Sequence, residues 1–489
     1  MPEHENPALG NCARGDNARG DNARGENAMG RVNRIHFVGI GGAGMSGIAE
    51  VLHNLGYQIS GSDQRQSRVT KHLSSLGINI EIDHDPAQVN GCDVVVISSA
   101  IAADNPELLE ARAKRIPVIP RAEMLAELMR FQQGIAVAGT HGKTTTTSLV
   151  ASILAEGGLD PTYVIGGLLN SSGSHARLGA GKYMVAEADE SDASFLHLQP
   201  TIAILTNIDA DHLETYGGDI DCLQENFIEF LHHLPFHGLA VICLEDEGVR
   251  KIMGNILKPF KTYGFDADAD YFAHDIHHQG QQSSFQVSRA DKKEWLQVKL
   301  NLPGKHNILN ALAAIAVAHE VGVADESIIT ALAEFQGISR RCQVLGEIKI
   351  QNKKVLLIDD YAHHPREIDA TLEGVRQGWP DKRIVVIFQP HRYTRTRDLF
   401  EDFCLVLSET DKLLLLDIYS AGENPVAGAD GRSLCRAIRQ RGQVDPIFVE
   451  QHEEIPRLLE NIIEENDLLL VLGAGNVAEV SANLLQQYG

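Results

Sequence analysis

The chain has 489 residues, too many for one ordinary hydrophobic core, so we expect two to four domains. Its formal net charge of −23 argues against nucleic acid or an anionic membrane surface as the main partner, because both reward clustered Lys and Arg. The seven cysteines form no CxxC pair, and no apolar run reaches the roughly 18 residues of a membrane span. We therefore expect reduced thiols and a cytoplasmic protein.

Residues 1–30 are rich in Asn, Gly and charge, and they repeat with a five-residue period, NARGD at 17–21 and NARGE at 22–26. A segment of this composition cannot bury a hydrophobic core. We predict a disordered low-complexity extension and assign no function to it.

Alternating strand and helix signals begin at residue 31. In the segment 31–131, strands are predicted at 35–38, 57–60, 93–97 and 117–120, and helices at 45–55 and 121–130. Repeated strand–helix–strand units are typical of a parallel, doubly wound sheet, so we predict a Rossmann-like N-terminal domain.

Two further α/β segments follow, at 132–338 and 339–489. The first has predicted strands at 135–138, 183–186, 201–206 and 239–243, and a helix at 307–321; the second has strands at 354–358, 384–388, 412–417 and 468–472, and a helix at 365–377. The expected fold class is α/β with three domains: Rossmann-like, central P-loop ATPase-type parallel sheet, and Rossmann-like C-terminal.

The sequence GTHGKTT at 139–145 lies between a predicted strand and a predicted helix. Its glycines let successive backbone N–H groups turn inward toward phosphate oxygens, and the helix adds its positive N-terminal end. Lys143 then meets the β and γ phosphates of a triphosphate, and the Thr144 hydroxyl binds Mg²⁺. The alternative is a solvated Gly/Thr turn, which the flanking strand and helix disfavour. The predicted ATP-binding residues of this loop are Gly139, Thr140, His141, Gly142, Lys143, Thr144 and Thr145.

A second glycine turn, GIGGAG at 39–44, matches GxGxxG, and Asp63 closes the next strand at a spacing suited to a ribose hydroxyl. The pattern alone leaves open NAD, another nucleotide with a diphosphate, and a purely structural turn. Because the chain has a separate ATP loop, two nucleotide sites need an explanation. A dehydrogenase would explain only one of them.

Acidic residues follow two strands of the central segment, as EADESD at 187–192 and TNIDADH at 206–212. The carboxyl ends of parallel strands meet at one edge of a sheet, so these groups are expected to face the triphosphate. Mg²⁺ needs hard oxygen ligands, which Glu187 and Thr144 supply. His212 is either a ligand of a second metal or a hydrogen-bonding group at a helix start. We interpret the remaining acids, Glu190 and Asp192, as a solvated face.

The C-terminal segment repeats this arrangement, with DDYAHHP at 359–365 and QPHRYTR at 389–395 after two strands. Arg392 and Arg395 have the geometry to bind a carboxylate or a phosphate through two hydrogen bonds each. A lone histidine is more often structural than catalytic. These histidines, however, stand beside Asp, Tyr and Arg where α/β folds place ligands.

With these motifs, residues 32–488 resemble the Mur ligases of bacterial cell-wall synthesis. The resemblance depends on seven motifs in the family's order: HFVGIGGAGMSGIA at 36–49, GTHGKTT at 139–145, EADESD at 187–192, TNIDADH at 206–212, HNILN at 306–310, DYAHHP at 360–365 and QPHRYTR at 389–395. Accidental agreement across three domains is very improbable.

The resemblance implies roles for further residues. The first glycine turn would hold the diphosphate of a UDP-sugar, with a substrate set of Gly41, Gly42, Gly44, Met45, Ser62, Asp63, Ser98 and Ser99. ATP would be bound in addition by His306 and Asn310 near the adenine, Arg341 at the phosphates and Asp360 at the ribose. The amino-acid and acyl-phosphate site would contain Tyr361, His363, His391, Arg392 and Arg395, and the implied catalytic residues are Lys143, His363, His391 and Arg392.

Sister ligases that add later residues carry a lysine, often carbamylated, about fourteen positions after the NxxDH histidine. Here Asn226 or Phe227 occupies that place, so no carbamate is expected, and this absence resembles the alanine-adding branch. The resemblance thus implies ATP- and Mg²⁺-dependent joining of L-alanine to UDP-N-acetylmuramate through an acyl phosphate. The alternatives are a recycling ligase that adds a tripeptide to the same sugar and, from another class, a nucleotide-switched binding module. The sequence leaves monomer and dimer open.

Overall fold

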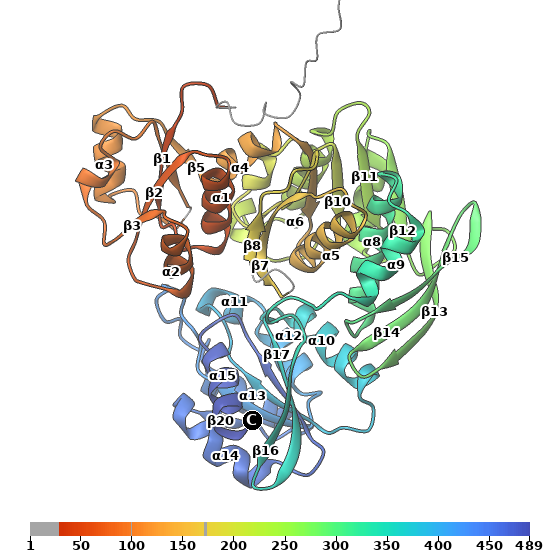
Figure 1. The fold of residues 1–489 in the computed structure, drawn as a ribbon. Coiled ribbons are helices and arrows are strands. Elements are labelled where there is room, and N and C mark those ends of the chain that lie inside the picture. Colours follow the sequence, from red (N-terminus) through yellow and green to blue (C-terminus); the bar gives the residue numbers. More distant parts are fainter. Residues whose placement is uncertain (1–28, 99, 171–173) are drawn as a thin grey trace, which may run out of the picture.

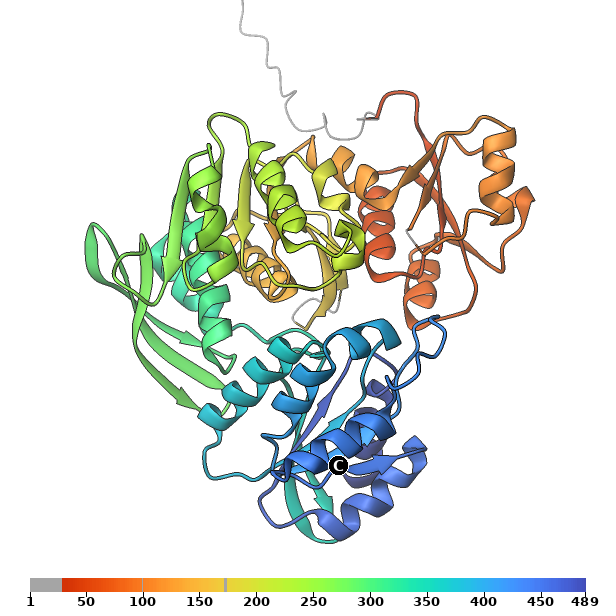
Figure 2. The same cartoon turned by 180° about the vertical axis from the view of Figure 1, so that it is seen from behind.

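The computed structural model describes residues 29–98, 100–170 and 174–489. The predicted extension therefore lies almost wholly outside the described residues, as does Ser99. Three α/β domains are present, each with its own sheet. In Figure 1 the first domain (red to orange) lies beside the central domain (yellow to green), and the third (blue) lies below both; Figure 2 shows the same arrangement from behind.

The first domain is a five-stranded parallel sheet in the order β3-β2-β1-β4-β5. Its elements are β1 Arg34–Val38, α1 Ala43–Asn54, β2 Gln58–Asp63, α2 Arg68–Ser75, β3 Asn79–Ile82, β4 Val94–Ile97, α3 Pro106–Ala113, β5 Val118–Pro120 and α4 Arg121–Met129. The strand order changes direction at β1 and β4, which is where nucleotides bind in open α/β sheets.

The central domain is a ten-stranded sheet in the order β15-β14-β13-β12-β11-β10-β6-β9-β7-β8. Its strands are β6 Gln133–Ala138, β7 Thr162–Leu169, β8 Ser174–Arg177, β9 Tyr183–Glu187, β10 Ile202–Leu205, β11 Leu239–Cys243, β12 Phe260–Gly264, β13 Tyr271–Gln279, β14 Gln282–Arg289 and β15 Lys292–Leu300. Its helices are α5 Lys143–Glu156, α6 Ile220–His232, α7 Glu247–Ile252, α8 Lys305–Glu320 and α9 Asp325–Ala333.

The third domain is a six-stranded sheet in the order β16-β17-β21-β18-β19-β20, parallel except for β16. Its strands are β16 Gln343–Ile350, β17 Lys353–Asp360, β18 Ile384–Phe388, β19 Lys412–Leu416, β20 Ile447–Val449 and β21 Leu468–Leu472. Its helices are α10 Pro365–Gly378, α11 Tyr393–Asp398, α12 Phe400–Leu407, α13 Gly431–Arg441, α14 Ile455–Ile462 and α15 Ala478–Tyr488.

The central parallel strands are apolar runs covered on both faces, which is why their sequences predict strands well. The strands β12 to β15 were not predicted. The burial of β13 alternates along its length, and its outward positions carry polar side chains such as those of His277 and Gln279. The strands β13 to β15 pair antiparallel with one another, and a sheet of this kind can present one face to water, so its apolar signal is weak.

The carboxyl ends of β6, β9 and β10 come together, as the parallel register predicts. Val137 on β6 pairs with Glu187 on β9, and Ala138 pairs with Leu205 on β10. The three loops that follow these strands therefore share one edge of the central sheet. The third domain turns the loops after β17 and β18 toward the same space (Figure 1).

The helices among the described residues are each too short or too polar to cross a bilayer. The six cysteines in that part of the chain are free, and Cys12 lies outside it.

Backbone-to-backbone contacts join the central and third domains through two glycine pairs. The N–H of Gly280, in the turn after β13, donates to the carbonyl oxygen of Gly378 at the end of α10, at 2.7 Å. Gly304, just before α8, lies against Gly374, whose added Cβ would come within 3.1 Å of the Gly304 Cα. These contacts leave no room for side chains along the seam.

We expect Gly378→Ala to destabilise this seam, because its Cβ would lie 2.3 Å from the carbonyl oxygen of Gly280. Overpacking of this kind costs about 1–3 kcal/mol. The measurement is the midpoint of thermal unfolding, which should fall by several degrees, together with the radius of gyration from solution scattering. Gly254→Ala is the matched control, since its Cβ would meet nothing within 4 Å. Equal midpoints for the two variants would contradict the expectation.

Candidate functional site

The phosphate loop joins β6 to α5 and depends on glycine at two positions. Gly139 has φ 122° and Gly142 has φ 82°. A Cβ at Gly142 would lie 2.6 Å from Asn310 Oδ1, and a Cβ at Gly139 would clash with the hydroxyl of Thr206. The loop is therefore seated between the loop after β10 and helix α8, two segments that the sequence assigned to the same site.

Lys143 bonds to its own loop. Its Nζ lies 2.7 Å from the carbonyl oxygen of Gly139 and 3.0 Å from that of Thr140. It also lies 2.7 and 2.9 Å from the two carboxylate oxygens of Glu190. Glu190 is only 2% exposed, which corrects its interpretation as part of a solvated face. Burial raises the pKa of Glu190 to about 7, although Lys143 opposes this rise.

The two residues predicted to bind Mg²⁺ lie together. The Glu187 carboxylate accepts the N–H of Gly166 at 2.6 Å and a hydrogen bond from the Thr144 hydroxyl. Burial raises the pKa of Glu187, and the hydrogen bonds and Lys143 only partly offset it. A buried carboxylate beside a hydroxyl is a donor set that suits a hard divalent cation.

His212 comes from the separate loop after β10 and lies near Asp211, with Nε2 3.6 Å from the carboxylate. Burial lowers the pKa of His212 despite that neighbour. The ring is therefore neutral near pH 7 and keeps a lone pair for a metal or a hydrogen-bond donor.

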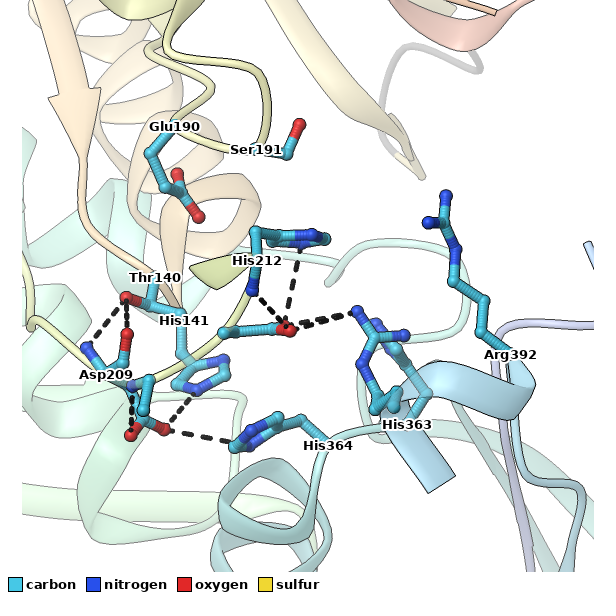
Figure 3. A network of polar contacts seen from close by, with 12 residues as sticks. Thr140, His141, Glu190, Ser191, Asp209, His212, His363, His364 and Arg392 are labelled. Atoms are coloured by element: carbon cyan, nitrogen blue, oxygen red, sulfur yellow. Dashed lines mark hydrogen bonds and ion pairs between the residues drawn. The ribbon is translucent and has the colours of Figure 1, made fainter. Parts of the chain in front are cut away.

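A charged network connects the phosphate loop with the third domain (Figure 3). His141 lies with Nε2 2.9 Å from Asp209 and Nδ1 3.4 Å from Glu367, and His364 Nδ1 lies 3.7 Å from Asp209. Burial lowers the pKa of His141, but the bonds to Asp209 and Glu367 more than offset it and raise the pKa to about 9.

The ligand atoms of His141, Asp209 and His364 lie within 4.8 Å of one another, a spacing that a metal ion could use. A raised imidazole pKa means that His141 holds its proton at neutral pH. The group therefore acts as an ion pair, and a metal would have to displace that proton.

Glu367, on the first turn of α10, is the centre of this network. Its carboxylate accepts the backbone N–H groups of His363 at 3.0 Å and His364 at 3.3 Å. Besides His141, it lies 3.9 Å from the guanidinium of Arg341. Burial raises the pKa of Glu367, but His363 and His141 outweigh it, so the pKa lies well below its usual range.

A cavity of about 260 Å³ lies between the central and third domains. Predicted ATP-binding residues in its lining are His141, Gly142, Thr145, His306, Asn310, Arg341 and Asp360. Burial lowers the pKa of His306 to about 4, so its ring is neutral. Burial also raises the pKa of Asp360 to about 6, even though it accepts the N–H groups of Cys342 and Ala362.

A second cavity, of about 340 Å³, lies where the amino-acid site is predicted. Its lining includes Asp211, His212, Arg392 and Arg395. One nitrogen of Arg395 lies 3.2 Å from each carboxylate oxygen of Asp211. Arg392 is more exposed and lies 3.8 Å from Glu423.

Two histidine rings of the third domain, those of His363 and His391, lie 5.8 Å apart. Burial lowers their pKa values to about 4 and about 3, and nearby charges such as Arg395 add to this for His391. The Tyr361 ring lies 5.3 Å from the His363 ring, and the guanidinium groups of Arg340 and Arg341 are each 5.2 Å from the Tyr361 ring centre.

Some of the non-glycine residues with left-handed backbone lie in these loops. The residues concerned are Ala193 (φ 57°), His212 (φ 56°), Arg340 (φ 59°), Cys342 (φ 44°) and Arg392 (φ 72°). Such conformations cost of order 1–3 kcal/mol each and concentrate where a site fixes its geometry.

Several of the residues predicted to bind the UDP-sugar lie close together around the first glycine turn. Asp63 Oδ2 accepts the N–H of Gly41 at 2.9 Å, and Ser98 lies beside Gly39. Ser62 is fully buried and its hydroxyl donates to Glu107 at 2.9 Å, so its side chain lies beneath the turn. Met45 is buried as well, whereas Gly42 and Gly44 begin helix α1.

The sequence analysis missed three groups that the structure brings into the site: Glu190, Asp209 and Glu367. Glu367 had a signal, because His364 at the helix N-cap with Glu367 three residues later forms a capping box. Glu190 and Asp209 had none beyond their position in acidic loops after strands.

Comparison with known proteins agrees with this layout. Three family models match the chain: the Mur ligase family catalytic domain over 34–133, the Mur ligase middle domain over 137–318 and the Mur ligase glutamate ligase domain over 340–475. A UDP-N-acetylmuramate–L-alanine ligase of Halorhodospira halophila is 58% identical over 455 residues, 93% of either chain.

Two solved structures are also similar over 93% of this chain and 98% of theirs. A UDP-N-acetylmuramate-alanine ligase from Thermotoga maritima has a TM-score of 0.78 at 31% identity. A murein peptide ligase from Psychrobacter arcticus has a TM-score of 0.68 at 25% identity. The chain belongs to the Mur ligase family.

Proposed function

We propose that this protein is an ATP-dependent ligase that joins L-alanine to the lactyl carboxylate of UDP-N-acetylmuramate, in the cytoplasm, for peptidoglycan precursor synthesis. The observation that carries the proposal is the 58% identity, across 93% of the chain, to a protein named for this reaction. The geometry supports it, because a phosphate loop, a second glycine turn and an arginine-lined cavity face one interdomain space.

The reaction must first bring two anions together. A carboxylate oxygen of the UDP-sugar attacks the γ phosphorus, the bond to the β-phosphate oxygen breaks, and ADP leaves. Because the carboxylate of the UDP-sugar and the triphosphate repel each other, neutralising their charge is the main demand on the site. Lys143 and Arg341 supply positive charge on the ATP side, and Arg395 supplies it on the side of the second cavity.

Mg²⁺ would be held by Thr144 and Glu187, with His212 as a candidate ligand of a second ion. Its chemistry when bound is to neutralise phosphate charge and to orient the γ phosphate. When ATP binds, Lys143 exchanges its hydrogen bonds to the carbonyl oxygens of the loop for hydrogen bonds to phosphate oxygens. The Glu190 carboxylate stays paired with the ammonium group during this exchange.

In the second half of the reaction the amine nitrogen of L-alanine attacks the acyl carbon. The bond from that carbon to the phosphate oxygen breaks, phosphate leaves and the amine loses a proton. His363 is the first candidate to take it, although burial lowers its pKa to about 4. Its Nδ1 lies 3.0 Å from the carbonyl oxygen of Tyr361 and 3.2 Å from Glu367, so Nδ1 carries the ring proton and Nε2 keeps the lone pair. His391 is the second candidate acceptor.

The direct test is phosphate release from ATP with Mg²⁺ and UDP-N-acetylmuramate, in the presence of L-alanine, a tripeptide or neither. We expect release that depends on L-alanine and a product heavier by one alanine residue. Release only with the tripeptide would instead assign the chain to recycling, and release with neither would indicate a nucleotide switch.

Replacing Lys143 by alanine should abolish measurable turnover and leave UDP-sugar binding intact, because the two sites lie on different domains. Loss of one such contact in the transition state costs on the order of 3 kcal/mol, about a hundredfold in rate, or more. Single-turnover kinetics and calorimetric titration with UDP-N-acetylmuramate measure the two effects. Lys251→Ala, at an exposed position on α7, is the control. An equal loss of UDP-sugar affinity would contradict the prediction.

The network around His141 should make stability depend on pH. The pKa of His141 is raised to about 9 from an ordinary value of 6.5. The contribution of His141 to the free energy of unfolding is therefore complete below pH 6.5 and is lost as the pH rises through about 9. The full effect on the free energy of unfolding is on the order of 3 kcal/mol, because each pKa unit corresponds to about 1.4 kcal/mol. The midpoint of thermal unfolding, measured from pH 6 to 10, should be lower for His141→Asn than for the wild type at pH 6, and this difference should disappear at high pH.

The matched control for this series is His197→Asn, at an exposed position. Its unfolding midpoint should follow that of the wild type at every pH. A gap for His141→Asn that stays constant from pH 6 to 10 would show that the histidine stabilises the fold without its charge.

A further inference from the structure

The segment that follows β19, residues 417–423, lies beside the loop that carries His391 and Arg392. The N–H of Arg392 donates to the carbonyl oxygen of Tyr419 at 2.9 Å, and the N–H of Tyr419 donates to that of Pro390, also at 2.9 Å. The rings of His391 and Tyr419 are stacked, with centres 5.5 Å apart and an interplanar angle of 12°. This segment therefore holds two residues of the predicted amino-acid site in place.

Glu423, at the end of this segment, contacts the first turn of α11 through both of its carboxylate oxygens. Oε2 accepts the N–H of Thr394 at 3.0 Å, and Oε1 accepts the Thr394 hydroxyl at 2.7 Å. The first N–H groups of a helix lack partners within the helix, and the N-cap residue, Arg392, makes no side-chain bond to them. Glu423 thus caps α11 from a separate loop, and these bonds fix the position of its carboxylate.

The same carboxylate lies beside the guanidinium of Arg392. Glu423 Oε1 is 3.8 Å from Arg392 Nη1, which is an ion pair but too long for a direct hydrogen bond. Burial raises the pKa of Glu423, but the bonds from Thr394 and the charge of Arg392 outweigh it, so the pKa lies below its usual value. Glu423 is therefore ionised at neutral pH. It attracts the guanidinium without occupying its hydrogen-bond donors.

Arg392 needs such a support because its backbone is left-handed, with φ 72°. A residue other than glycine keeps this conformation only where the surrounding contacts hold it. Figure 3 shows the Arg392 side chain extending away from the ribbon of its domain, and the residue lines the second cavity together with Asp211 and His212. Its side chain is 40% exposed, so burial alone does not fix where the guanidinium points.

We propose that Glu423 is a positioning residue for the amino-acid substrate, whose carboxylate holds the guanidinium of Arg392 in place to bind the carboxylate of L-alanine. The inference rests on the proposed function and adds to it a residue that acts through Arg392. The charges in the second cavity agree with it, because Arg395 is already bonded to Asp211. The substrate carboxylate supplies the direct hydrogen bonds that Arg392 does not receive from Glu423.

The test compares L-alanine with L-alaninamide, which has the same amine but no carboxylate. Phosphate release from ATP, with Mg²⁺ and UDP-N-acetylmuramate, gives kcat/KM for each amine. The wild type should prefer L-alanine, because only L-alanine engages Arg392. Glu423→Gln keeps an oxygen for the N–H of Thr394 and loses the charge beside Arg392, so this preference should shrink about tenfold. The KM values for ATP and for the UDP-sugar should not change.

If L-alaninamide reacts too slowly, its inhibition constant against L-alanine replaces kcat/KM in the comparison. The matched control is Glu401→Gln, which removes an exposed carboxylate of the same domain that also pairs with an arginine, Arg441. This variant should keep the preference of the wild type.

A purely structural role for Glu423 predicts a different pattern. If Glu423 only caps α11, Glu423→Gln should lower the reaction with both amines by the same factor and leave the preference unchanged. That result would overturn the proposal. A wild type that reacts equally well with both amines would overturn it too, because the substrate carboxylate would then have no cation to bind.

If Glu423→Gln fails to fold, as judged by thermal unfolding, Glu423→Asp takes its place. Aspartate keeps the charge but is one methylene shorter, so it cannot reach Thr394 and Arg392 at once, and the preference should fall about threefold. An unchanged preference in this variant would contradict the proposal. A wild-type chain that releases no phosphate with L-alanine would refute the proposed function itself, which is a separate result.

Discussion

The buried carboxylate of Glu367 holds the third domain against the phosphate loop. It accepts two backbone N–H groups from its own domain and pairs with His141 from the central domain. Removing such a charge from water is costly unless every lone pair finds a donor. The position of α10, and with it the direction of the histidine loop before it, depends on that requirement being met.

The overall acidity of the chain makes the placement of its cations informative. With a net charge of −23, the protein has no general attraction for anionic ligands. Four cations lie around the candidate site, and each has an acidic partner: Lys143, Arg341, Arg392 and Arg395. Paired cations of this kind favour ligands that can replace a carboxylate, as phosphates and carboxylates do.

Much of the fold could be predicted from the sequence, because buried parallel strands are continuous apolar runs between glycine turns. The strands around residues 135–138, 384–388 and 468–472 are examples. The antiparallel strands β13 to β15 were missed, since their outward faces are polar, and the short parallel strand β12 was missed as well. No local pattern distinguishes an antiparallel extension of this kind from a charged surface loop.

The candidate site was predictable to the extent that its chemistry lies in contiguous motifs. Lys143, Glu187 and Asp360 each stand at the end of a strand, where topology decides what they face. Glu190 was missed because its burial depends on a lysine 47 positions away, which no local pattern reveals. The pairing of His141 with Glu367 joins two domains, so only the packing of those domains could reveal it.

The bonds that Lys143 makes within the protein bear on how tightly a phosphate group can bind beside it. The ammonium group already has two carbonyl oxygens and a carboxylate as partners, so phosphate binding exchanges partners and adds few. The loop is consequently preformed, which reduces the entropy lost on binding. The same exchange limits affinity, because the departing contacts offset the new ones.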